Sequence, residues 1–276
     1  MRSLVVLLVP VLLPGVPASR SDAACTPLST GATGCVPSDK PTLKCELRVN
    51  KNATRLHAAV VACHKKEADL LVRCQGKPSR GACKTRPGVC DEGICNDGKT
   101  DCTTDAQCPP ALFNDESCEA LTKFDAANRA LAGCPACLDV PGAARAHTVG
   151  TGLVTLHDTL LEPMTYCAGN PAVTLGDRGL LPPDAATLRC EDAFGRNIAR
   201  FLAAILACHS RAATAGVKGK PFDGTACEAA AAGRFDAANA RLRGCGTCTA
   251  QSAAQLRTTI PQQVDDDGIF CAQTTP

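Results

Sequence analysis

The chain has very few aromatic residues, with no tryptophan, one tyrosine and seven phenylalanines among 276 residues. Its apolar residues, 45% of the total, are therefore mainly alanine, valine and leucine, which bury little area each and form cores that need reinforcement. The 29 basic and 27 acidic residues are interspersed, and few aromatics are present to stack on bases. We therefore expect no nucleic-acid partner.

Long apolar runs are missing after the N-terminus. Met1 and Arg2 form a short basic start, and an apolar stretch from Leu4 to Leu13 is interrupted by Pro10. This pattern is typical of a signal peptide, which we place at residues 1–24. Because no later run of 18 apolar residues exists, we expect no integral membrane segment after signal removal and a secreted or periplasmic protein.

Cysteine, in contrast, is abundant. Twenty cysteines occur in the chain, which is far above ordinary usage, and the number is even. An even, high count is typical of full pairing in an oxidising compartment. The sequence therefore indicates a fold reinforced by disulfides.

The sequence repeats itself. Residues 37–45 match residues 182–190. Residues 123–128 likewise reappear as residues 234–239, and a Cys-x-x-Cys motif follows both of these later segments. We divide the chain into a signal peptide (1–24), an N-terminal segment (25–38), helical unit 1 (39–169, with a Cys-rich insertion at 74–108), a linker (170–183) and helical unit 2 (184–276).

Periodicity predicts that the units are helical. Apolar residues follow at steps of four, three and four in both leading segments, at Val49, Ala53, Leu56 and Val60 and at Phe194, Ile198, Phe201 and Ile205. Asp39 and Asp184 stand where an N-cap is expected, and a shorter third helix should follow each Cys-x-x-Cys, ending before Pro261 in unit 2. The predicted fold is all-α, with two repeated disulfide-stapled helical-hairpin units.

Cysteine spacing suggests a connectivity. Cys45 and Cys63, like Cys190 and Cys208, are 18 residues apart, which is five helical turns and places both on one face. Six cysteines allow 15 pairings, so the connectivity is a hypothesis. The structural disulfides that we expect are Cys25–Cys35, Cys45–Cys134, Cys63–Cys118, Cys137–Cys167, Cys190–Cys245, Cys208–Cys227 and Cys248–Cys271.

The Cys-rich insertion contains Gly, Asp, Thr and Pro residues that are typical of turns. Its even number of cysteines permits pairing within the segment, among Cys74, Cys83, Cys90, Cys95, Cys102 and Cys108.

Two patterns offer alternatives to a purely structural interpretation. The motifs Cys134/Cys137 and Cys245/Cys248 could serve a thiol-disulfide oxidoreductase, but they follow a helix instead of the strand that such a motif requires, which favours structural disulfides. Carboxylates beside glycine at Asn96–Gly98, Asp101 and Asp105, or at Asp265–Gly268, would suit a calcium-stabilised adhesion module, without EF-hand spacing.

Repeated polar residues receive ordinary structural interpretations. We expect His64 and His209 to lie near helix C-termini, where they complement the helix dipole. We expect the pairs Asp125/Asn128 and Asp236/Asn239 to lie on a solvated helix face. We predict no catalytic residue, no cofactor and no metal ligand.

The units resemble Ala- and Cys-rich exported proteins of environmental, myxobacterial-type bacteria. The resemblance lies in the leading Leu-Lys/Arg-Cys helix, the Phe-Asp-Ala-Ala helix and the Cys-x-x-Cys, and the segment 95–108 is similar to short Cys-rich repeats of such proteins. It covers most of the mature chain and implies no assigned activity. The sequence thus favours a non-enzymatic, disulfide-rich structural or binding protein that contacts an extracellular protein or surface ligand.

Overall fold

The computed structural model describes residues 35–74, 90–91, 94–95, 103–104, 119–131, 134, 138, 144–174, 179–265 and 269–270. Its helices are α1 (Lys40–Cys74), α2 (Ala120–Arg129), α3 (Ala144–Leu156), the π-helix η4 (His157–Leu161), α4 (Glu162–Thr165), α5 (Ala185–Val217), α6 (Gly224–Asn239) and α7 (Thr247–Asp265). The predicted all-α class is confirmed. None of the described helices is long and apolar enough to cross a membrane.

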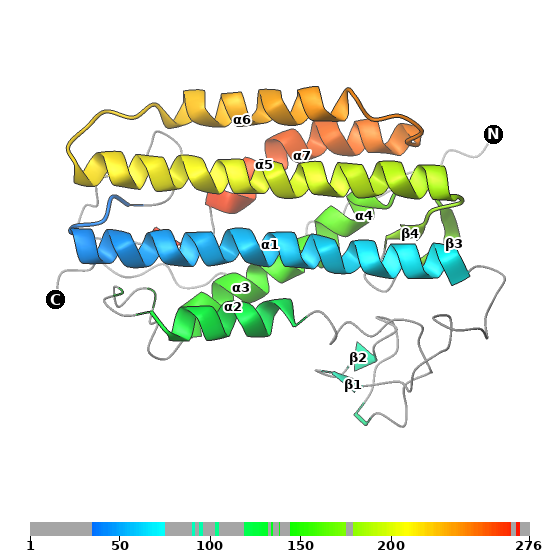
Figure 1. The fold of residues 1–276 in the computed structure, drawn as a ribbon, viewed down its shortest axis with the longest axis horizontal. Coiled ribbons are helices and arrows are strands. Elements are labelled where there is room, and N and C mark those ends of the chain that lie inside the picture. Colours follow the sequence, from blue (N-terminus) through cyan, green and yellow to red (C-terminus); the bar gives the residue numbers. More distant parts are fainter. Residues whose placement is uncertain are drawn as a thin grey trace, which may run out of the picture.

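Two long helices, α1 and α5, lie side by side at the centre of the molecule and run in opposite directions (Figure 1). Their antiparallel register is fixed by contacts at both ends. Asn50 Nδ2 donates to the carbonyl oxygen of Leu206 and to Ser210 Oγ, each at 2.7 Å, and Lys65 Nζ lies 2.8 Å from Asp192 Oδ2. Helices α2 and α3 pack against α1, and α6 and α7 pack against α5.

The two central helices begin where the sequence predicts. Asp39 Oδ1 accepts from the backbone N–H of Thr42 at 2.7 Å. Asp184 Oδ1 accepts from the N–H groups of Ala186 and Thr187, each at 2.8 Å. These bonds satisfy backbone donors that have no partner within the first turn of a helix, so each aspartate acts as an N-cap.

One cluster of buried apolar side chains, drawn from both halves of the described chain, forms the main core. It includes the predicted apolar positions of both central helices, all at most 5% exposed. Three of the few aromatic residues gather here: the rings of Phe201 and Phe235 stack at 4.7 Å, and Phe194 lies 6.2 Å from Phe235. The scarce large side chains are therefore concentrated between α5 and α6.

The structure differs from the sequence prediction in its last helix and around it. Helix α7 runs through Pro261 to Asp265, although we expected it to end before the proline. Leu256, Ile260 and Val264 are all buried, so packing of this face offsets the backbone hydrogen bond that the proline removes. Helix α6 ends at Asn239, and Gly244 takes a positive φ of 78° in the turn that follows.

Short hairpins add to the helices. Strand β3 (Asn170–Thr174) pairs with β4 (Leu180–Leu181) inside the segment predicted to be a linker. Strand β1 (Cys90–Asp91) pairs with β2 (Ile94–Cys95) inside the predicted insertion, while Cys74, expected to open that insertion, is the last residue of α1. The predicted signal peptide and residues 25–34 lie outside the described residues.

Candidate functional site

Three disulfides join the helices at the positions that the spacing predicts. Their Cα atoms are 5.1 Å apart in Cys45–Cys134, 5.3 Å in Cys190–Cys245 and 5.8 Å in Cys208–Cys227. The first two occupy matched positions of the sequence and tie the start of α1 and of α5 to the segment after α2 and after α6. Each long helix is therefore clamped to its neighbour by the same kind of bond.

A fourth disulfide links Cys167 to Cys248, with Cα atoms 6.0 Å apart. The predicted pairs Cys137–Cys167 and Cys248–Cys271 are therefore wrong. Helix α4 packs against both α5 and α7, and this places the segment after α4 beside the start of α7. The predicted connectivity paired cysteines only within each unit, so it excluded a disulfide that joins unit 1 to unit 2.

Several predicted sites lie outside the described residues or side chains. Cys35, Cys63 and Cys74 are disulfide-bonded, but the side chains of their expected partners, Cys25, Cys118 and the other insertion cysteines, are not described. Cys137 and Cys271 also lie outside the described residues. Of the two candidate calcium segments, only the backbone of Asp265 is described.

A buried carboxyl group stands beside the Cys167–Cys248 bond. Glu191 is fully buried, and its Oε1 accepts from the backbone N–H groups of Cys167 at 3.0 Å and Ala168 at 2.8 Å. Its Oε2 is also buried and makes no hydrogen bond. Burial raises the pKa of Glu191 to about 7, the two backbone donors oppose the rise, and the neighbouring Asp192 adds to it.

The surroundings of this disulfide favour exchange chemistry over metal binding. A carboxylate oxygen of Glu191 and the two sulfur atoms lie within 4.8 Å of one another. Because the sulfurs are bonded to each other, they do not offer thiolate ligands to a metal. Cys248 is the second residue of α7, and Thr249 Oγ1 lies 3.8 Å from Cys167 Sγ. A helix start of this kind stabilises a thiolate.

Histidines gather between α1 and η4. His57 Nδ1 and His157 Nε2 are 2.7 Å apart, and both side chains are 1% exposed. The ring of His64 lies 6.2 Å from that of His157, and His64 Nε2 is 3.4 Å from Asp158 Oδ1. Burial lowers the pKa of His57 to about 4, and burial together with its two histidine neighbours lowers that of His157 well below its ordinary value. Both imidazoles are therefore neutral at pH 7.

A very small cavity adjoins these histidines. It is lined by His64, His157, Glu162 and Tyr166 among others, and its volume of about 10 Å³ is at the lower limit for one water molecule. Tyr166 donates from its hydroxyl to Asp192 Oδ1 at 2.9 Å. A cavity of this size excludes an organic substrate, so we interpret the histidine cluster as a polar part of the core.

The predicted placement of His64 and His209 near helix ends is wrong. Helix α1 continues ten residues beyond His64, and α5 continues eight residues beyond His209. Both side chains are buried and face carboxylates, His64 facing Asp158 and His209 facing Glu228 at 3.5 Å. The helical spacing of apolar residues continues in the sequence beyond Cys63-His64 and beyond Cys208-His209. This spacing could have predicted that α1 and α5 extend past both histidines.

The predicted solvated face is wrong for Asp125 and Asn128, which are both buried, whereas Asp236 and Asn239 are partly exposed. Asn128 is fully buried, and its Oδ1 accepts from Asn52 Nδ2 at 2.7 Å. At the matched positions, Asn239 Oδ1 accepts from Asn197 Nδ2 at 2.8 Å. The aspartates face neighbouring helices as well: Asp125 Oδ2 lies 2.7 Å from His147 Nδ1, and Asp236 Oδ2 lies 3.2 Å from Arg257 Nη1. These repeated residues join helices to one another.

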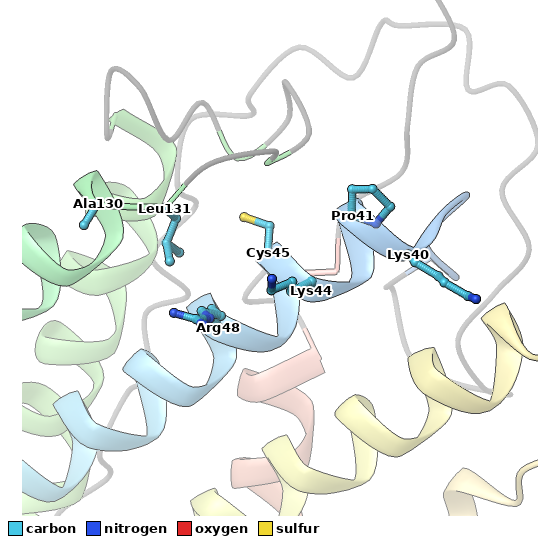
Figure 2. Close-up of a pocket in the computed structure, with 7 residues that line it drawn as sticks. All are labelled: Lys40, Pro41, Lys44, Cys45, Arg48, Ala130 and Leu131. Atoms are coloured by element: carbon cyan, nitrogen blue, oxygen red, sulfur yellow. The ribbon is translucent and has the colours of Figure 1, made fainter.

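A groove of about 520 Å³ opens between the start of α1 and the end of α2. Figure 2 shows three basic side chains along its α1 side, with Arg48 directed toward α2. The residues that line it are Lys40, Pro41, Lys44, Cys45, Arg48, Ala130 and Leu131. Sequence reasoning missed this groove because it treated the basic residues as interspersed, although their spacing of four already placed three of them on one helix face.

Comparison with protein-family models, with curated proteins and with solved structures finds no match for this chain.

Proposed function

We propose that the chain is an exported, non-enzymatic structural or binding protein whose helices are held by disulfides, in keeping with its resemblance to myxobacterial-type Ala/Cys-rich proteins. One observation carries this proposal. All eleven cysteines whose side chains are described are disulfide-bonded, and Cys245 and Cys248 of the same Cys-x-x-Cys are bonded to two different partners. A dithiol catalyst instead needs the two motif cysteines to bond to each other.

A non-reducing peptide map of the exported protein, with free thiols trapped before digestion, tests this proposal. We expect a peptide that joins Cys190 to Cys245 and another that joins Cys167 to Cys248, with no trapped thiol at any of the four. We also expect no acceleration of insulin reduction by dithiothreitol. An internal Cys245–Cys248 bridge, or insulin reduction that disappears when these cysteines are replaced, would contradict the proposal.

A second candidate function is thiol-disulfide exchange at Cys167–Cys248, which the position of Glu191 favours. Among the four described disulfides, only this one has both cysteines partly exposed, whereas each of the others contains one buried cysteine, namely Cys45, Cys190 or Cys208. A buried carboxyl group next to an accessible disulfide can deliver a proton to a leaving sulfur.

The exchange requires an external dithiol as reductant. One thiolate of the dithiol attacks Cys167 Sγ, the Cys167–Cys248 bond breaks, and Cys248 leaves as a thiolate that takes a proton from Glu191. The second thiol of the dithiol returns a proton to Glu191, and its sulfur attacks the mixed disulfide. Cys167 is released and protonated, so the protein disulfide is reduced by two electrons and the dithiol becomes a cyclic disulfide.

Glu191→Gln distinguishes the second candidate from the first. If the carboxyl group transfers protons, the variant reduces at Cys167–Cys248 at least ~10-fold more slowly in dithiothreitol. Glu46 is the matched control, because it also is fully buried and follows a helix cysteine, and Glu46→Gln should leave this rate unchanged. Equal rates in wild type and Glu191→Gln would remove the second candidate and leave the first intact.

A further inference from the structure

We propose that the exposed basic face of α1 binds an extended anionic polysaccharide, such as a polyuronate or a sulfated glycan. This inference names the partner of the proposed exported binding protein and therefore rests on that function. We call the five residues that carry it the α1 basic stripe: Lys40, Lys44, Arg48, Lys51 and Arg55.

The geometry of the stripe follows from the helix. Its members are separated by four, four, three and four residues, which places them within a sector of about 80° over a length of about 22 Å. All five side chains are exposed. The only acidic residue between Lys40 and Arg55 is Glu46, which is fully buried on another face of the helix. The stripe is thus a straight row of charges of one sign.

The charges of the stripe are not balanced by neighbouring groups. Within the described part of the chain, none of the five forms an ion pair, and the nearest acid in sequence, Asp39, is already bonded to the N–H of Thr42. Neighbours along the row are about 5–6 Å apart along the axis, within the Debye length of about 8 Å at physiological ionic strength, so their potentials add. The whole chain has a net charge of only +2, so the positive charge of the stripe is a local feature.

The N-terminal end of the stripe lies at the start of the helix. Lys40 is the first residue of α1, and the first turn contains no acidic residue, so basic side chains stand at the positive end of the helix dipole. This placement opposes helix stability and favours an anion. The groove that is lined by Lys40, Lys44 and Arg48 opens at this same end (Figure 2).

The lining of the groove decides between kinds of polyanion. The other described residues that line it are aliphatic or cysteine, chiefly Pro41, Ala130 and Leu131, and none of these described lining residues is aromatic. Single-stranded nucleic acids bind through aromatic stacking, for which the described part of this surface offers no side chain. Insertion into a bilayer needs large apolar side chains on the exposed helix face, and the stripe residues offer only charges. Purely electrostatic attraction to an anionic bilayer is the competing outcome that the vesicle measurement below tests. Aliphatic surface beside a row of cations suits sugar rings that carry carboxylate or sulfate groups.

The test compares two variants that change the net charge equally. The first is Lys44→Glu/Lys51→Glu/Arg55→Glu on the stripe. The second is Arg189→Glu/Arg196→Glu/Arg200→Glu at the matched positions of α5, which are also exposed. On α5 the row is interrupted, because alanine occupies the positions that match Lys40 and Arg48.

Binding of heparin and of polygalacturonate is measured by titration calorimetry at several salt concentrations. We expect wild type to bind with a log–log salt slope of about −3.5 if all five charges are neutralised, by analogy with single-stranded polyanions. The stripe variant should bind at least ~30-fold more weakly and the α5 variant less than ~3-fold more weakly. Far-UV circular dichroism checks folding, and Lys44→Gln/Lys51→Gln replaces the stripe variant if that one does not fold.

Three outcomes would overturn the inference. They are absence of binding to both polysaccharides at 50 mM salt, equal losses in the two variants, or stronger binding to duplex DNA or to phosphatidylserine vesicles than to either polysaccharide. The peptide map and the insulin assay do not depend on the stripe, so a failure here leaves the proposed disulfide-stabilised scaffold standing.

Discussion

At the scale of single residues, the core contains ionisable groups whose pKa values are shifted in the direction that favours the uncharged form, downward for histidine and upward for glutamate. His57 and His157 are neutral because burial lowers their pKa values, and Glu191 is partly protonated near pH 7 because burial raises its pKa. Sequence reasoning could not anticipate this, since a histidine or glutamate in a helix carries no sign of its burial. The matched position of His57 is Leu202, which shows that the fold accepts an apolar residue there.

The two histidines should make the protein less stable in acid. The pKa of His57 is about 4 in the folded protein and about 6.5 when unfolded, so the unfolded chain binds more protons between these values. The free energy of unfolding then falls as pH falls through this window, by up to about 1.4 kcal/mol per pH unit for each histidine. We expect His57→Leu/His157→Leu to lose this dependence in urea unfolding at pH 7 and pH 5. A double variant that keeps the wild-type dependence would contradict this assignment.

Glu191 should act in the opposite direction. Its folded pKa of about 7 lies above the ordinary value of 4.5, so the native state binds more protons between these values and loses stability as pH rises through them. Glu191→Gln should remove a penalty on the order of 3 kcal/mol at pH 8 and should unmask the acid instability caused by the histidines. Urea unfolding at pH 5 and pH 8 measures this, with Glu119→Gln on the surface as control. An unchanged difference between the two pH values would refute the assignment.

At the scale of elements, polar side chains contribute, as apolar ones do, to determining which helices pack against each other. The contact of Asn52 with Asn128 and that of Asn197 with Asn239 join each long helix to the short helix beside it at matched positions. The sequence revealed the repetition of these residues but placed Asn128 on the solvated face. A helical pattern in which polar residues face another helix looks the same as one in which they face water.

We expect Asn52→Ala to cost more stability than Asn197→Ala. Asn128 is fully buried and would be left without its donor, which costs about 1–3 kcal/mol, whereas Asn239 is half-buried and can bind water instead. Thermal and urea unfolding of the two variants gives the comparison. Equal losses, or a larger loss in Asn197→Ala, would mean that the buried amide pair has no special role.

Helix starts were easier to predict than helix ends. Asp39 and Asp184 accept hydrogen bonds from backbone N–H groups three residues later in the chain, so the local sequence is enough to predict these N-caps. The end of α7 depends on whether Leu256, Ile260 and Val264 find a surface to pack on, and that surface belongs to distant segments. The basic stripe was likewise present in the sequence as a spacing of four, four, three and four, and was missed because charges were counted along the chain and not around the helix.

At the scale of the whole molecule, the two predicted units share one core. The antiparallel contact of α1 with α5 and the bond from Cys167 to Cys248 both join segments that the sequence assigns to different units. The repeat in the sequence could predict what lies within each unit, including Cys45–Cys134 and Cys190–Cys245. It could not predict how one unit meets the other, because that contact occurs only once.

Residues 184–276 should therefore not fold by themselves. Produced alone with Cys248→Ser, this segment would expose the apolar face that α5 turns toward α1, and we expect no cooperative thermal transition by circular dichroism. The full chain is the control and should unfold in a single calorimetric transition. Cooperative melting of the isolated segment would instead show two independent domains.

The connection from Cys167 to Cys248 also affects how the protein is made. The two cysteines are 81 positions apart, and a chain that emerges from its N-terminus presents Cys190 to Cys167 long before Cys248 has been synthesised. Oxidation in order of appearance would give Cys167 another partner, so a chain that is oxidised before α7 has been synthesised needs its bonds reshuffled afterwards. A host compartment that contains only an oxidant would accumulate scrambled isomers, and recombinant production calls for a disulfide isomerase.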